Sequence, residues 1–214
     1  MNIRTCILLA SGRLKPYESM LRKRIKKYIS AIFKFLPLKD IDIIVLDNPE
    51  GVISHLGVGG YAMNGNTLYI NLDPGHKEFK KVVNVCLFST LAHELHHVMR
   101  FKTVGYGNTL FEALISEGLA DHFDIEVTRQ KPPDWSTALS EKQIQFFLKK
   151  AAKDFNNQNY IHRDWFFGSE KRKIPKWTGY SLGFFLVQNY LKNYPKKKAS
   201  MLHKTKASEF LKNS

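Results

Sequence analysis

The sequence predicts an α+β fold with a small mixed sheet in its N-terminal part and a mainly helical C-terminal part. Two short β-rich runs, Asp42–Leu46 and Thr67–Leu72, are bounded by turn residues. Apolar residues at helical spacing dominate the second half of the chain. With 214 residues, 43% of them hydrophobic, the chain can bury a sizeable core. We therefore expect one domain over residues 1–214, with an α/β part of about residues 1–100, a helical part of about residues 101–214 and a cleft between them.

The N-terminal part begins with an expected amphipathic basic helix over residues 17–33, where apolar residues recur at helical spacing and Lys and Arg fill most of the gaps. Asn64-Gly65-Asn66 predicts a hairpin turn before the run 67–72. The glycines within residues 57–60 lack the spacing of a phosphate-binding loop, which favours a bend between strands. The run 67–72 could pair with an extended peptide, although pairing inside the sheet is the commoner use of a strand.

The segment His93-Glu94-Leu95-His96-His97 has the H-E-x-x-H spacing of a zinc-binding helix. Residues 79–92 contain no Gly or Pro, and Asp73-Pro74 offers an N-cap and first-turn pair, so the motif is expected on a helix. On that helix His93 and His97 share one face and can bind one metal ion, whereas His96 lies about 100° away. Glu94 is the candidate general base. One apolar stripe of this helix is expected to face the core: Val83, Leu87, Leu91, Leu95 and Val98.

The motif alone is not decisive, because the histidines of an isolated H-E-x-x-H can also form an ordinary polar helix edge. A second expected helix adds to it: Thr109-Leu110-Phe111-Glu112 has the form of a capping box and opens a run to Phe123. Glu117 on this helix can be the third protein ligand of a catalytic zinc ion. Asp121, one turn later, can accept the outer N–H of a ligand histidine, or it is an ordinary solvated carboxylate.

Together these segments resemble the gluzincin metallopeptidases, in which H-E-x-x-H is followed on a second helix by E-x-x-x-D. Nineteen residues, 98–116, separate His97 from Glu117, as in the thermolysin-like branch. Within this group the chain is most similar to the YjaZ-like zinc-dependent protease family. Four segments carry the resemblance: Gly59–Ala62, His93–Arg100, Thr109–Asp121 and Trp177–Gly183. It implies a zincin-like metallopeptidase fold, with His93, His97 and Glu117 as ligands of one zinc ion per chain, Glu94 as base and Asp121 as partner of a ligand histidine.

The residues and the resemblance imply the same chemistry, in which Glu94 takes a proton from a zinc-bound water that attacks a peptide carbonyl. The resulting oxyanion needs a further donor. Tyr180 is the first choice, because Gly179-Tyr180 opens an expected helix over residues 180–191 and matches the resembled family, although most tyrosines simply pack. His162 and Tyr106 are weaker candidates. Ser140-Glu141-Lys142-Gln143 is another capping-box form, opening a helix toward Phe155.

The charge balance supports a rival hypothesis. Thirty-three Lys and Arg against nineteen Asp and Glu give a formal charge of +14, which attracts nucleic acid or anionic surfaces. No nucleic-acid motif accompanies this charge, so we expect a peptide or protein substrate rather than nucleic acid, and a weak association with anionic surfaces stays open. A protease-like fold that serves as a sensor or a single-partner binding module is a further alternative, against which the intact Glu94 argues.

Cysteine content and hydropathy indicate the cellular compartment in which the protein is expected. The two cysteines, Cys6 and Cys86, are too few for a disulfide framework. No stretch approaches the roughly 18 apolar residues needed to cross a bilayer, and the apolar run at residues 6–10 is shorter than the core of a signal peptide. The expected location is the cytoplasm.

Overall fold

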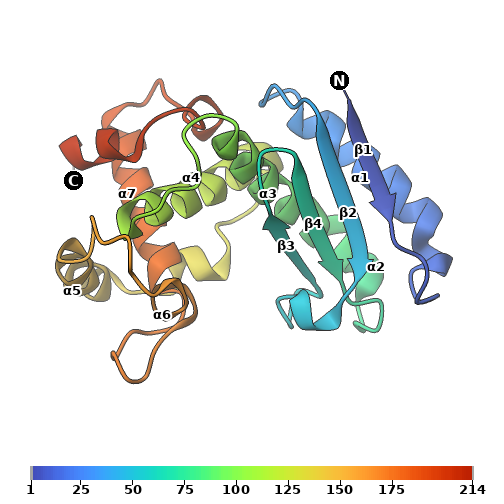
Figure 1. The fold of residues 1–214 in the computed structure, drawn as a ribbon, viewed down its shortest axis with the longest axis horizontal. Coiled ribbons are helices and arrows are strands. Elements are labelled where there is room, and N and C mark those ends of the chain that lie inside the picture. The colour runs from blue at the N-terminus through green and yellow to red at the C-terminus, as the bar shows by residue number, and fades with distance from the viewer. Residues whose placement is uncertain (1, 214) are drawn as a thin grey trace. The chain divides into compact units, whose positions relative to one another are not determined.

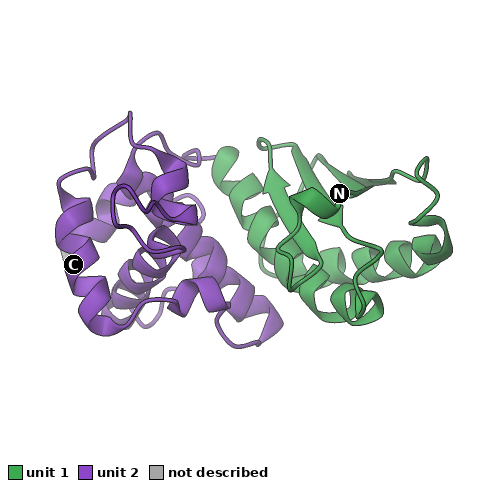
Figure 2. Cartoon of the chain, turned by 90° about the horizontal axis from the view of Figure 1, so that it is seen from below, with its two compact units in different colours: residues 1–102 green, residues 103–214 purple. Residues whose placement is uncertain are grey.

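The computed structural model describes residues 2–213 and divides into two compact units, residues 1–102 and residues 103–214 (Figure 2). The first unit combines a four-stranded mixed sheet with helices, and the second is mostly helical (Figure 1). At this level the predicted α+β class is confirmed. No helix within the described part of the chain is both long and apolar enough to cross a membrane.

The first unit begins with a β-α-β segment, which the sequence predicted only in part. Strand β1 (Ile3–Ile7) was not expected, because most of its residues alternate between exposed and half-buried and give only a weak apolar signal. The elements of this unit, in order, are β1 (Ile3–Ile7), η1 (Lys15–Tyr17), α1 (Glu18–Ile32), β2 (Ile41–Asp47), η2 (Pro49–Gly51), β3 (Val58–Ala62), β4 (Thr67–Leu72), α2 (Phe79–Lys81), the π-helical turn η3 (Val82–Cys86) and α3 (Leu87–Phe101).

The sheet has the strand order β1-β2-β4-β3, in which β1, β2 and β4 run parallel and β3 is antiparallel at one edge. Strand β4 therefore has partners on both sides, and the idea that residues 67–72 pair with a peptide is wrong. The expected bend at residues 57–60 is also wrong beyond Gly57, because Val58, Gly59 and Gly60 lie inside β3 and pair with β4. Only Gly57, at φ 65°, makes the turn before the strand. The hairpin turn predicted before β4 is confirmed.

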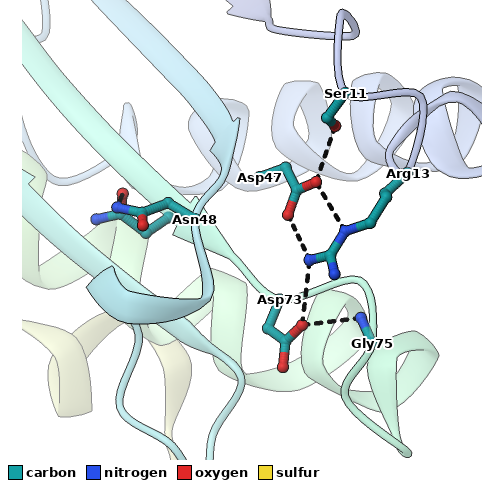
Figure 3. Close-up of polar contacts among 7 residues, drawn as sticks. Ser11, Arg13, Asp47, Asn48, Asp73 and Gly75 are labelled. Atoms are coloured by element: carbon teal, nitrogen blue, oxygen red, sulfur yellow. Dashed lines mark hydrogen bonds and ion pairs between the residues drawn. The ribbon is translucent and has the colours of Figure 1, made fainter.

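Polar side chains tie together the loops that follow the three parallel strands (Figure 3). Both oxygens of Asp47, at the end of β2, accept from Arg13 at 2.8 and 2.6 Å, and one of them also accepts from Ser11 at 2.8 Å. Arg13 lies 3.5 Å from Asp73, which in turn accepts from the Gly75 N–H at 2.9 Å. The hydrogen bond from Arg13 lowers the pKa of the Asp47 carboxyl. The cluster thus fixes the loop after β1 to the ends of β2 and β4.

The helix that carries the histidine motif starts later than predicted. Asp73 and Pro74 form a separate turn, and the helix begins at Phe79 after Glu78. It continues through the π-helical turn η3 into α3. The expected apolar stripe is confirmed, since its five residues are fully buried or nearly so: Val83, Leu87, Leu91, Leu95 and Val98. Helix α3 contacts β3 and β4, and α1 contacts α3, so both helices cover one face of the sheet (Figure 1).

Helix α1 has the predicted amphipathic character. Its inner face is buried: Leu21, Ile25, Tyr28, Ile29 and Ile32. The basic side chains Arg22, Lys23, Lys26 and Lys27 remain exposed. The apolar stripe is thus used for packing inside the first unit, as expected for a helix with one solvated Lys-rich face.

The second unit is built around the pair of helices α4 (Leu110–Thr128) and α7 (Thr178–Asn193), which cross with their backbones in close contact. A Cβ atom at Gly118 of α4 would lie 2.1 Å from the carbonyl oxygen of Gly183 in α7, so only glycine fits there. The predicted capping boxes at Thr109 and Ser140 are both present. The elements are α4 (Leu110–Thr128), η4 (Asp134–Thr137), α5 (Glu141–Ala152), α6 (His162–Phe167), α7 (Thr178–Asn193), η5 (Ala199–Met201) and η6 (Ala207–Asn213).

Candidate metal centre

In the first unit, His93 and His97 project from the same face of α3. Their Nε2 atoms lie 3.0 Å apart, and their rings meet at 77° with centroids 4.7 Å apart. Two nitrogen ligands of a tetrahedral zinc ion, each about 2.05 Å from the metal, are about 3.3 Å apart. The two histidines are therefore close to the spacing that a shared metal ion requires. His96, one residue earlier than His97, is fully buried.

Glu94 is buried against the open edge of strand β3. The backbone N–H of Ala62 donates to its Oε2 at 2.8 Å. A Cβ atom at Gly60 would lie 2.3 Å from Glu94 Cγ, so the absent side chain makes room for the carboxylate. Neither contact followed from the H-E-x-x-H spacing. The signal was present in Gly59–Ala62, which the resemblance used, but we had interpreted its glycines, Gly59 and Gly60, as part of a bend over residues 57–60.

The turn that leads into α3, η3, is π-helical, and a tyrosine of α1 contacts its carbonyl groups. In a π-helical turn each hydrogen bond spans one residue more than in an α-helix, which disturbs the regular pairing of the carbonyls. The hydroxyl of Tyr28 in α1 lies 3.1 Å from the carbonyl of Val83 and 2.9 Å from that of Asn84, and it can donate to either. The Tyr28 ring stacks on Phe88 at 4.7 Å. Helix α1 therefore braces the start of the helix that carries both histidines.

In the second unit, Glu117 is buried on α4 and has an aromatic partner. The hydroxyl of Tyr106 donates to its Oε1 at 2.7 Å. Tyr106 is half-buried as a residue, and its hydroxyl lies within protein. This burial, followed by the nearby Glu117 charge, raises the pKa of Tyr106 well above its usual value. Tyr106 thus stays protonated near neutral pH and holds one oxygen of the carboxylate.

Asp121 is fully buried one turn after Glu117, and its carboxylate is anchored within the second unit. The indole N–H of Trp135 donates to Oδ1 at 3.1 Å, and the hydroxyl of Ser136 donates to Oδ2 at 2.6 Å. The reading of Asp121 as an ordinary solvated carboxylate is therefore wrong. Trp135 and Ser136 lie in η4, a segment for which the sequence analysis named no role.

The three candidate oxyanion donors occupy different surroundings. Tyr180, in the first turn of α7, packs edge-on against Phe166, with ring centroids 5.0 Å apart. The ring of His162 stacks on Phe166 at 4.2 Å, and its Nδ1 lies 3.1 Å from the hydroxyl of Tyr160. Burial lowers the pKa of His162 and raises the pKa of Tyr160 to about 12. Tyr106, the third candidate, donates instead to Glu117.

Comparison with known proteins agrees with the motif. A family model described as "Predicted Zn-dependent protease (DUF2268)" matches residues 21–212. The chain belongs to this family. The predicted resemblance to YjaZ-like proteins is also confirmed, because residues of this chain are 33% identical over 108 positions to "Uncharacterized protein YjaZ" of Bacillus subtilis (strain 168). That alignment covers 47% of this chain and 41% of the relative, so the chain spans less than half of the length of this relative. No solved structure matches.

Proposed function

We propose that this protein is a gluzincin-type zinc peptidase, with a zincin-like fold and residues 1–214 acting as one catalytic domain. The observation that carries the proposal is the 3.0 Å separation of the His93 and His97 Nε2 atoms. Glu94 follows His93 in the sequence, and the backbone N–H of Ala62 in β3 holds its carboxylate. We infer that Glu117 supplies the third donor, because His93, His97 and Glu117 are a combination of residues that could hold a metal ion. This donor set is the one expected for a catalytic zinc ion with an open position.

Each residue has a defined part in the proposed reaction. Zinc, when bound, lowers the pKa of a coordinated water and polarises the peptide carbonyl. Glu94 accepts a proton from the attacking water and later delivers it to the leaving amine. Asp121 accepts the outer N–H of a ligand histidine and fixes its tautomer. Tyr180 donates a hydrogen bond to the oxyanion that develops on the carbonyl oxygen.

The deciding experiment combines metal analysis with cleavage of a diverse peptide library, in the presence and absence of a chelator. Wild-type protein is expected to bind one zinc ion per chain and to lose cleavage on chelation. Glu94→Gln should keep zinc and lose turnover, because the amide cannot accept the proton. Glu117→Ala should weaken zinc binding itself. Glu141→Gln, an exposed helix glutamate, is the matched control and should resemble wild type.

Three results would count against the proposal. Full hydrolysis by Glu94→Gln removes the base assignment. Unchanged zinc affinity in Glu117→Ala removes the third ligand. A zinc-free, inactive wild type under zinc-replete conditions favours the binding-module alternative over the peptidase.

A further inference from the structure

The loop before α4 is joined to the helix at the residue proposed as third ligand. Tyr106 donates its hydroxyl proton to Glu117 Oε1 at 2.7 Å, and the carbonyl of the same tyrosine accepts from the hydroxyl of Ser116. Side chain and backbone of Tyr106 are thus both fixed to adjacent residues of α4. Such a double attachment leaves the carboxylate little freedom to rotate about its terminal bonds.

We propose that Tyr106 is a positioning residue that makes Glu117 a one-oxygen metal ligand. This inference rests on the proposed zinc site. A carboxylate can bind a metal through one oxygen or through both. A hydroxyl proton on Oε1 withdraws electron density from that oxygen and leaves Oε2 as the better donor. One-oxygen binding keeps the metal at three protein contacts, so the fourth position stays open for water.

The surroundings of Tyr106 suit this role and offer a matched comparison. The Tyr106 hydroxyl lies 2.7 Å from Glu117 Oε1 and donates to it, which is the contact that this role requires. Tyr160 also lies within electrostatic reach of Glu117, but its hydroxyl pairs with His162 Nδ1 instead. Tyr106 and Tyr160 therefore both lie near Glu117, but only Tyr106 is hydrogen-bonded to it.

The test compares Tyr106→Phe with Tyr160→Phe in the full chain. Loss of a hydrogen bond to a metal ligand typically costs about 10–100-fold in metal affinity, so we expect that loss for Tyr106→Phe in a zinc competition titration. Tyr160→Phe should stay within about twofold. Cobalt(II) substitution supplies a second readout, because four-coordinate cobalt absorbs visible light more strongly than five-coordinate cobalt. The visible band should weaken in Tyr106→Phe only, as the freed Oε1 joins the metal.

Further variants separate this role from packing. Tyr106→His keeps a ring donor and should recover part of the zinc affinity and of the cobalt band, and it remains informative should Tyr106→Phe fail to fold. Equal losses of zinc affinity in Tyr106→Phe and Tyr160→Phe would assign the effect to packing and overturn the inference. An unchanged affinity and cobalt spectrum in Tyr106→Phe would overturn it while leaving the peptidase intact. A wild type that binds no zinc would instead remove the proposed function, and the inference with it.

Discussion

The two units hold their candidate site residues by different means. In the first unit the backbone positions the side chains: helical spacing aligns His93 with His97, and the Ala62 N–H donates to Glu94. In the second unit side chains from loops and short turns hold the carboxylates of α4, as Tyr106 does for Glu117. The two units thus differ in the kind of contact: backbone geometry and a backbone N–H position the candidate residues of the first unit, and side-chain donors position those of the second.

Gly60 in the first unit differs from Gly118 and Gly183 in the second in the atoms that surround it. At Gly60 in the first unit, an added Cβ atom would meet the Glu94 side chain, which can rotate away. At Gly118 and Gly183 in the second unit, it would meet backbone atoms, which cannot move without separating α4 from α7. We therefore expect substitutions at these three glycines to affect different quantities, activity at Gly60 and stability at Gly118 and Gly183.

The largest effect is expected for Gly183→Ala. Its Cβ atom would lie 2.1 Å from the carbonyl oxygen of Leu114, far inside van der Waals contact. Because the obstacle is backbone, the helices must move apart and lose packing, at a cost of about 3 kcal/mol or more in the free energy of unfolding. Urea unfolding measures this change. Gln145→Ala, at an exposed position of α5, should stay within about 0.5 kcal/mol. Equal stability of the two variants would contradict the backbone crossing.

Gly60→Ala is expected to act on turnover instead. The added methyl group displaces the Glu94 carboxylate, and misplacement of a catalytic group by about 1 Å can cost about 100-fold in rate. The loss should appear in kcat, with zinc content retained. Tyr61→Ala is the matched control, because the Tyr61 side chain is 60% exposed on the same strand. A Gly60→Ala variant with normal kcat would show that Glu94 does not need its present position.

The sequence predicted most elements whose signals are local. The capping boxes at Thr109 and Ser140, the apolar stripe of α3 and the strand 67–72 follow from spacing over a few residues, and the structure has them all. Edge strand β3 was missed because its glycines contribute no side-chain pattern. What makes Val58–Ala62 a strand is pairing with β4, which only the three-dimensional arrangement reveals.

The residues of the candidate site were likewise predictable where their signals are local. His93, Glu94 and His97 follow from one helical motif, and Glu117 and Asp121 from the second helix. The residues that hold these side chains could not be found in this way, since hydroxyl and indole donors such as Ser136 and Trp135 have no fixed spacing from the carboxylate that they bind. The assignment of the metal ligands and of the base stays a prediction until metal binding is measured.

Acid is expected to weaken the second unit through His122. Burial lowers the pKa of His122, although the Phe184 carbonyl, 3.1 Å from Nε2, and Asp121 oppose this. The unfolded chain, with an ordinary pKa near 6.5, then binds the proton more readily than the folded chain. The contribution of neutral His122 to the free energy of unfolding is complete above about pH 6.5. It is lost as the pH falls toward the folded pKa, by at most about 1.4 kcal/mol per pH unit. His162, whose pKa is also lowered, acts with the same sign.

Unfolding of the metal-free protein between about pH 7.5 and 5.5 measures this slope. His122→Gln keeps an N–H donor for the Phe184 carbonyl but does not titrate, so its slope should be shallower than that of wild type. An unchanged slope would show that His122 carries the same proton affinity in the folded and unfolded chains.

The smallest effect is expected at the brace between α1 and the histidine helix. Tyr28→Phe keeps the ring that stacks on Phe88 and removes the hydroxyl that serves the carbonyls of Val83 and Asn84. Loss of one buried hydrogen bond costs about 1 kcal/mol. Amide hydrogen exchange should quicken in residues 82–86 while α4 keeps its protection, because the carbonyls that the Tyr28 hydroxyl serves belong to the first unit. If exchange quickened equally in α4, the two units would unfold as one. The contrast between them would then apply to their contacts and not to their unfolding.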